Sequence, residues 1–176
     1  DALTGRHDGV DMIEALERAN LFIIRLDREQ IWFRYHHLFQ HFLRKQKDAQ
    51  GKSAVQALQR RASRWYEQNA MPAEALRFAL AGGAVAEAVR LLQHWGRTLL
   101  REGSFKELHG WLRAVGRADV RTSAELNLLD AWTQLYLGDA IAAGEALDAA
   151  ERCLPSPEST RRSLADEVLI VRSMCG

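Results

Sequence analysis

The sequence has few cysteines and no long apolar run. Its two cysteines, Cys153 and Cys175, are too few and too oddly placed for a disulfide framework or a metal site. Such low cysteine usage suits the reducing cytoplasm. No apolar stretch approaches the roughly 20 residues that span a membrane, and the N-terminus lacks the charged and then apolar layout of a signal peptide. We therefore expect a cytoplasmic protein without a membrane partner.

The chain also lacks an excess of charge of either sign. Its 24 Lys and Arg nearly balance 23 Asp and Glu, which gives a formal net charge of +1. Nucleic-acid binding normally needs a clustered basic face. Two stretches, 44–47 and 60–64, are locally basic, but the helix predicted at 38–43 is apolar and aromatic rather than lined with base-contacting polar residues. No direct DNA contact is expected from this chain.

What the sequence does contain is enough apolar material for a packed core. Hydrophobic residues make up 47% of the chain and charged residues 27%, which excludes a disordered tail. The chain begins with Asp1 instead of Met and stops at Gly176, soon after a helical pattern at 164–171. We expect it to be a piece of a longer protein.

The stretch 16–46 is the most informative, because its hydrophobic period changes twice. Apolar residues alternate over 21–26 and again over 31–35, as in two strands, and the four polar residues 27–30 between them suit only an antiparallel hairpin. Helical stripes precede and follow this hairpin, at 12–19 and at 38–43. The alternation places on one face Phe22, Ile24 and Leu26 in the first strand, and Ile31, Phe33 and Tyr35 in the second. The order helix, two-stranded wing, helix predicts the C-terminal part of a winged-helix domain, at 1–50.

Two motifs in this stretch resemble a known family. The runs LERANLF at 16–22 and YHHLF at 35–39 are similar to those of the MalT-like, LuxR-type, ATP-dependent transcriptional activators, within the signal-transducing nucleotide-switch ATPases. The resemblance covers about the first 47 residues. It implies a winged helix here, an ATPase domain upstream in the same chain, helical repeats downstream, and a DNA-binding helix-turn-helix at the far C-terminus, outside this sequence.

The region 51–176 reads as a succession of helices with short breaks. Helical stripes are separated at Pro72, Gly82, Gly103, Gly116 and Gly138, and no strand pattern interrupts them. Segments 65–80 and 132–147 look alike, since each begins with Trp and continues after a tight turn into Glu-Ala-Leu. Paired helices that repeat every 30 to 40 residues are typical of an α-solenoid. We predict an all-α fold with one small β-hairpin, in which tetratricopeptide-like repeats fill 51–176.

One candidate binding residue follows from the resemblance. The run 35–38 is similar to the methionine-histidine-aspartate-leucine motif of nucleotide-switch ATPases, whose histidine contacts the β-phosphate of bound ADP. His36 therefore carries over as an ADP-contacting residue that works only together with the upstream ATPase domain, where ATP or ADP would bind. Imidazole can donate the required hydrogen bond to a phosphate oxygen. The sequence departs from the motif at Tyr35 and His37, so no role transfers to His37. The alternative is that His36 caps a helix and binds no ligand.

Catalysis and metal binding by this chain are not expected. His37 and His41 lie four residues apart, but no third ligand lies nearby in the sequence to complete a metal site. The stretch 51–53, Gly-Lys-Ser, matches the tail of a phosphate loop but lacks the earlier glycine and the preceding strand. If the parent protein hydrolyses ATP, its catalytic residues lie upstream of Asp1.

Two functional hypotheses remain open. The first is a regulatory segment of an ATP-dependent transcriptional activator, in which the winged helix responds to nucleotide and the repeats sense an inducer or a protein partner. The second is a helical-repeat interaction scaffold with no nucleotide role. Four tryptophans suit either a ligand groove or packing between helix pairs, and packing is the more common role of such residues: Trp65, Trp95, Trp111 and Trp132.

Overall fold

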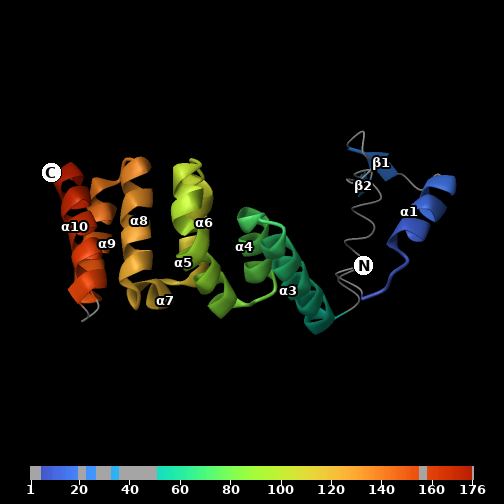
Figure 1. Ribbon diagram of the computed structural model, residues 1–176, viewed down its shortest axis with the longest axis horizontal. Helices are drawn as coiled ribbons and strands as arrows, with labels where there is room; N and C mark the ends of the chain where they lie inside the picture. Colours follow the sequence, from blue (N-terminus) through green and yellow to red (C-terminus); the bar gives the residue numbers. More distant parts are fainter. Residues whose placement is uncertain (1–4, 20–22, 27–32, 36–50, 155–157, 176) are drawn as a thin grey trace. The chain divides into compact units, whose positions relative to one another are not determined.

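The computed structural model describes residues 5–19, 23–26, 33–35, 51–154 and 158–175 (Figure 1). The chain divides into two compact units, Asp1–Ala62 and Ser63–Gly176. The predicted domain boundary between residues 50 and 51 stays a prediction. Within the described ranges, no helix is both long and apolar enough to cross a membrane.

The first unit contains the predicted helix and hairpin. Helix α1 spans Gly9–Arg18, and strands β1 (Ile23–Arg25) and β2 (Phe33–Tyr35) pair antiparallel. The order helix, strand, strand is confirmed. The predicted turn at 27–30, the helix at 38–43 and the residue His36 lie outside the described residues.

The register of the hairpin separates the two alternating apolar sets. Ile24 lies opposite Arg34, and Arg25 lies opposite Phe33. Residues directly opposite one another share a face of the sheet. Ile24 and Phe33 therefore lie on opposite faces, and Tyr35 is 39% exposed. Alternation identifies which residues of one strand share a face, but the mutual register of the strands depends on the connection between them.

The rest of the described chain is helical. Helix α3 (Lys52–Gln68) begins in the first unit and ends in the second. The later helices are α4 (Pro72–Ala81), α5 (Val85–Arg101), α6 (Phe105–Val115), α7 (Arg117–Arg121), α8 (Ala124–Tyr136), α9 (Ala140–Arg152) and α10 (Glu158–Cys175). Pro72 lies in the first turn of α4, and Gly82 and Gly116 cap the ends of α4 and α6, as predicted. The short helix α7 was not predicted.

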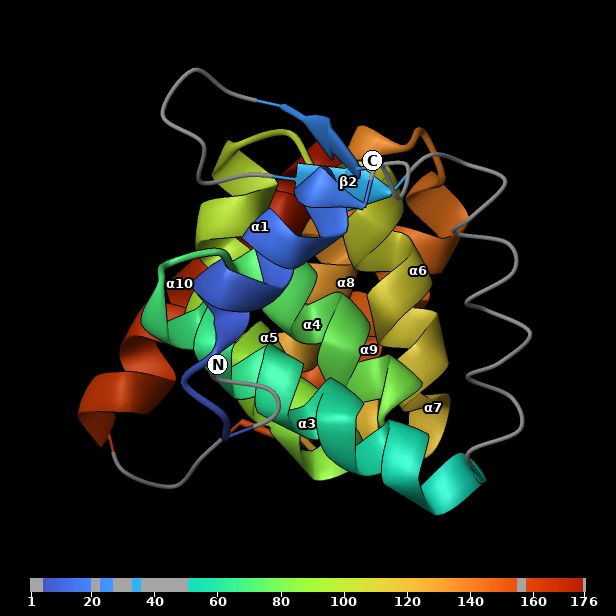
Figure 2. The same ribbon diagram turned by 90° about the vertical axis from the view of Figure 1, so that its right-hand side faces the viewer.

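In the second unit each helix packs on those that follow it in the sequence. Helix α4 contacts α5 and α6, α5 contacts α6 and α8, and α8 contacts α9 and α10. Figure 1 shows this succession from α4 to α10, and in the view turned by 90° (Figure 2) the same helices overlap, as expected for a stack seen along its length. Successive stacking of helix pairs is the arrangement predicted for an α-solenoid.

The apolar side chains of this unit form two clusters that meet at α8. The first cluster includes Leu76, Leu91 and Leu108, together with Leu126 and Leu129 of α8. The second joins other α8 residues with α9 and α10, through Leu128, Ala131, Leu147, Val168 and Val171. Helix α8 is buried on two sides because each cluster takes one of its faces, so it connects the earlier helix pairs to the later ones.

The turns inside the helix pairs repeat the same geometry. Ala70, Gly103 and Gly138 adopt positive φ angles of 55°, 81° and 84°, at intervals of 33 and 35 residues. In each turn the next residue donates a backbone hydrogen bond back to the carbonyl five residues earlier, and these bonds measure 2.9, 3.0 and 2.9 Å. This is the pairing of a Schellman motif. The intervals match the period of about 34 residues of tetratricopeptide repeats.

This repetition predicts the effect of exchanging alanine and glycine at the turns. An L-residue with a side chain loses roughly 1–2 kcal/mol in the left-handed region, and only part of this returns as lower entropy of the unfolded chain. Ala70→Gly is therefore expected to raise the free energy of unfolding by about 0.5–1 kcal/mol. Gly103→Ala, at the equivalent turn, should lower it by about 1 kcal/mol. Urea unfolding of both variants measures this, and a loss of stability in Ala70→Gly would contradict the shared turn geometry.

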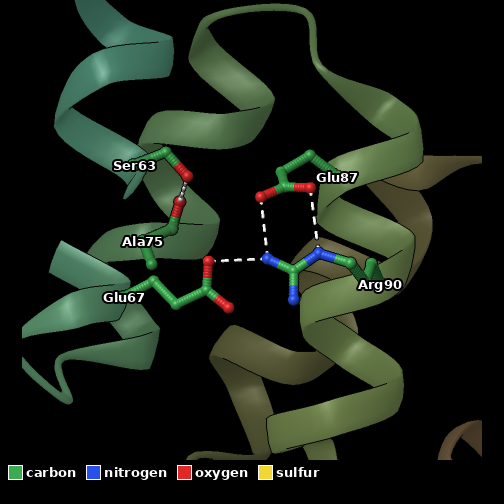
Figure 3. Close-up of polar contacts among 5 residues, drawn as sticks. All are labelled: Ser63, Glu67, Ala75, Glu87 and Arg90. Atoms are coloured by element: carbon green, nitrogen blue, oxygen red, sulfur yellow. Dashed lines mark hydrogen bonds and ion pairs between the residues drawn. The ribbon is translucent and has the colours of Figure 1, made fainter. Parts of the chain in front are cut away.

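Polar contacts tie α3 to α4 and to α5 within the second unit (Figure 3). The buried hydroxyl of Ser63 donates a 2.8 Å hydrogen bond to the carbonyl oxygen of Ala75. Arg90 of α5 pairs with Glu67 of α3 at 2.6 Å and with Glu87 of its own helix at 2.8 Å. The hydrogen bond from Arg90 lowers the pKa of Glu87. These contacts fix how the first helix pair sits against α5.

The close approach of α5 and α8 depends on a glycine. Gly96 is buried, and a Cβ atom at this position would overlap Cδ2 of Leu129. Gly96→Ala should therefore lower the free energy of unfolding by about 1–2 kcal/mol, because overpacking outweighs the better helix propensity of alanine. Gly110→Ala is the matched control, since that glycine lies in α6 with open space around it. Gly110→Ala should raise the free energy of unfolding by up to about 1 kcal/mol. Equal shifts of the urea midpoint would show that the α5–α8 contact is not tight.

Candidate functional site

Two cavities in the described part of the helical unit could hold a ligand. The first, called the aromatic groove, has a volume of about 310 Å³ and lies between α5, α8 and α10. Helices α5 and α8 each begin a helix pair, and α10 follows the second of these pairs, so the groove runs across the stack rather than within one pair. Its walls combine aromatic, acidic and basic side chains from the three helices: Arg97, Arg101, Glu125, Trp132, Tyr136 and Glu167.

Side chains in the aromatic groove hold one another in place. The indole nitrogen of Trp132 donates a 2.9 Å hydrogen bond to Oε1 of Glu167, and Arg97 pairs with the other carboxylate oxygen. The ring of Tyr136 stacks on Phe105, with centroids 4.4 Å apart, and on Trp132 at 6.0 Å. Tyr136 is nevertheless 57% exposed. A ligand would meet an ordered aromatic surface beside a carboxylate that is already positioned.

The packing role predicted for the tryptophans holds for three of them. Trp95 and Trp111 pack partly buried against the first apolar cluster, and Trp132 packs against the second. Trp132 also lines the aromatic groove, so it combines both roles considered for these residues. Trp65 lies edge-on against Tyr66, with ring centroids 5.1 Å apart.

The second cavity, called the arginine cavity, has a volume of about 240 Å³ and lies between α6, α7, α8 and α9. Its deeper polar residues come from α8. Asn127, only 2% exposed, donates hydrogen bonds to the carbonyl oxygens of Val120 (3.0 Å) and Ser123 (2.8 Å). It thereby joins the end of α7 to the start of α8.

A half-buried acid and a histidine are linked across the arginine cavity. The amide nitrogen of Gln134 lies 3.1 Å from Oδ1 of Asp130 and 3.1 Å from Nδ1 of His109, which accepts a hydrogen bond when it carries no proton. Burial raises the pKa of Asp130, while the hydrogen bond from Gln134 and the nearby positive charges oppose this shift. This link could not be predicted from the sequence, because His109 of α6 lies 21 positions before Asp130 and 25 before Gln134 of α8. Only the fold brings the two helices together.

The histidines singled out from the sequence lie outside the described residues: His36, His37 and His41. The ADP contact of His36 therefore stays a prediction. Among the residues that the structure describes, no group of three or more His, Cys, Asp or Glu side chains is placed to hold a metal ion.

Comparison with known proteins gives two kinds of relative. The chain is 32% identical over 176 residues to the serine/threonine-protein kinase PknK of Mycobacterium tuberculosis, which covers 98% of this chain and 16% of that protein. It is 33% identical over 131 residues to the HTH-type transcriptional regulator MalT of Vibrio cholerae, and 34% identical over 130 residues to that of Yersinia enterocolitica. Each MalT match covers 74% of this chain and 14% of the relative.

The chain thus spans less than one-fifth of the length of these relatives, 16% or 14%. No solved structure matches it. Residues 1–55 match the family model of the MalT winged helix domain. This match includes the helix and hairpin of the first unit, and helices follow it in the described chain. The chain is therefore MalT-like, with a MalT winged helix domain at its N-terminus and a helical region after it.

Proposed function

We propose that this chain is a regulatory segment of an ATP-dependent transcriptional activator. The winged helix would respond to the nucleotide state of an ATPase domain upstream in the same protein, and the helical stack would sense an inducer or a protein partner. One observation carries the proposal: a MalT winged helix domain is followed by stacked helices with an open aromatic groove. The segment itself would be neither an enzyme nor a DNA-binding module.

The names of the relatives support a role in regulation rather than in the kinase or transcription activity itself. One relative is a protein kinase and the others are transcriptional regulators, yet both kinds share this segment. A segment common to proteins with different outputs is suited to receive or relay a signal. The similarity to MalT in particular favours transcription as the output.

The nucleotide part of the proposal rests on His36. The histidine would donate a hydrogen bond to the β-phosphate of ADP held by the ATPase domain and so stabilise a closed, inactive state. The loss of one hydrogen bond to a charged phosphate should weaken ADP binding by about 1.5–3 kcal/mol. Since only the closed state makes this contact, the population would shift toward the open, active state.

The test is His36→Ala in the full-length protein that carries this chain. We expect weaker ADP binding by calorimetry and higher transcription without inducer. His37→Ala is the control, and it should change neither quantity. If His36→Ala folds and leaves both ADP affinity and basal transcription unchanged, the histidine has no nucleotide role. The interaction scaffold is then the better hypothesis.

The sensing part rests on the aromatic groove. Ligand sites favour concave, partly apolar surfaces with a few fixed polar groups, and the groove supplies Trp132 and Tyr136 beside Glu167. Because the groove is formed by α5, α8 and α10, which belong to successive layers of the stack, a ligand bound there would hold those layers together. This gives a direct physical route from binding to the arrangement of the stack.

A further inference from the structure

The arginine cavity has an unusual charge arrangement. Arg113 at the end of α6, and Arg117 and Arg121 of α7, follow one another at intervals of four residues, and all three line the cavity. The side chains are exposed, so they form a rim above a floor supplied by the buried Asn127 and the half-buried Asp130. Like charges gathered around a small concavity raise its positive potential.

These arginines differ from others of the same unit in their partners. Arg90, Arg97 and Arg172 each pair with one or two carboxylates. Within the described part of the chain, no ion pair joins the three rim arginines to a carboxylate. Their positive charge is therefore available to a ligand.

Two acids line the cavity, Asp130 and Glu145, and they offset only part of this charge. Asp130 is half-buried and receives its hydrogen bond from Gln134, so it interacts with Arg113 and Arg117 through their charges but forms no direct ion pair with them. Glu145 of α9 is exposed at the opposite wall, and the other α9 residues there are alanines. Three guanidinium groups thus face two carboxylates, of which only that of Glu145 is exposed, across about 240 Å³, which is a little below the usual range for drug-sized ligands.

We propose that the arginine cavity binds a small multivalent oxyanion, a phosphorylated or polycarboxylate metabolite, through Arg113, Arg117 and Arg121. The planar guanidinium group donates paired hydrogen bonds that match both phosphate and carboxylate oxygens. The amides of the buried Asn127 and the half-buried Gln134 stabilise the floor, because both already form hydrogen bonds within the protein. A bound anion would contact α6 and α7 together and so fix the connection between two helix pairs. This site is separate from the aromatic groove and does not depend on a nucleotide role.

Titration calorimetry of the 176-residue chain at constant ionic strength tests the proposal. The probes are inorganic phosphate, glycerol 3-phosphate and citrate, with glycerol as the uncharged control. We expect saturable binding of at least one of the two organic anions and none of glycerol. Preference for glycerol 3-phosphate would assign a phosphorylated ligand, and preference for citrate a polycarboxylate. Absence of saturable binding of all three anions would overturn the proposal.

Variants with matched charge changes locate the site. Arg117→Gln removes a rim charge and should lower the affinity for the anion about tenfold, which is the usual effect of losing a charge-assisted hydrogen bond. Arg77→Gln removes one charge from α4, where the guanidinium lies over Phe78 and outside the cavity, and should leave the affinity unchanged. Glu145→Gln should tighten binding several-fold, because it removes the opposing exposed carboxylate. Thermal melting confirms that each variant is folded. Equal weakening by Arg77→Gln and Arg117→Gln would mean that only net charge matters, and the assigned cavity would be wrong.

Discussion

Leu91→Ala is expected to lower the free energy of unfolding by about 3–5 kcal/mol, as the truncation of a fully enclosed leucine does when the cavity cannot collapse. The side chain of Leu91 is 0% exposed and belongs to the cluster that joins α4, α5, α6 and α8. Helix α5 contacts α4, α6 and α8, so the neighbours of Leu91 cannot all move in to fill the space. Urea unfolding followed by circular dichroism measures the loss.

Leu169→Ala provides the matched control on α10. The substitution removes the same atoms, but Leu169 is 64% exposed and lies outside both apolar clusters. We expect a change within about 0.5 kcal/mol, as for most surface substitutions. Comparable losses in the two variants would show that the packing of α5 is not what holds the stack together.

The helices of the second unit could be predicted well from the sequence, for a local reason. Apolar residues recur there at helical spacing, and residues with special backbone preferences stand at the ends. Pro72 occupies the first turn of α4, and Gly103 and Gly138 take the positive φ angles that the turns require. Hydrophobic periodicity and helix start and stop signals both depend on residues close in sequence, so they can be recognised without knowing the fold.

Features that depend on distant residues could not be predicted in this way. Helix α7 has five residues, of which only Val120 is buried, so it leaves no measurable period. Whether the apolar residues of β1 and β2 share one face of the sheet depends on the register of the strands, which the pairing of Ile24 with Arg34 shows. Both cavities arise where three or four helices meet, and the sequence does not state how those helices approach.

The candidate site shows the same division between local and distant information. The sequence singled out His36 by resemblance, and that residue lies outside the described part of the chain. It also singled out Trp132, which the structure places on the aromatic groove. It missed the arginines of the second cavity. Their spacing of four residues was visible, but Gly116 interrupts the helix between them, and their common cavity needed the positions of α8 and α9.

The buried amide of Asn127 gives the second large expected effect. Asn127→Asp keeps the shape of the side chain but replaces the amide group that donates to the carbonyl oxygens of Val120 and Ser123. An ionised carboxylate would face two oxygens in a site that is 2% exposed, with Asp130 one turn further along α8. We expect a loss of about 3 kcal/mol at pH 7, because the buried carboxylate faces two carbonyl oxygens and the arginines of the same cavity are exposed to solvent.

The pH dependence of this variant follows from the same surroundings. Burial and the two carbonyl oxygens should raise the pKa of the new carboxyl group in the folded state, as burial already does for Asp130. A raised pKa on folding means that the stability deficit is smallest at low pH, where the carboxyl group is protonated in both states. The deficit grows as the pH rises above the unfolded pKa of about 4.

Asn69→Asp is the control, because Asn69 is exposed and donates one hydrogen bond to the carbonyl of Trp65. It should cost less than about 1 kcal/mol and vary little with pH. Urea unfolding at pH 4.5 and pH 7 decides the matter: a deficit of Asn127→Asp relative to the wild type that is equal at both values, or equal to that of Asn69→Asp, would show that the amide does not join α7 to α8 as the structure has it.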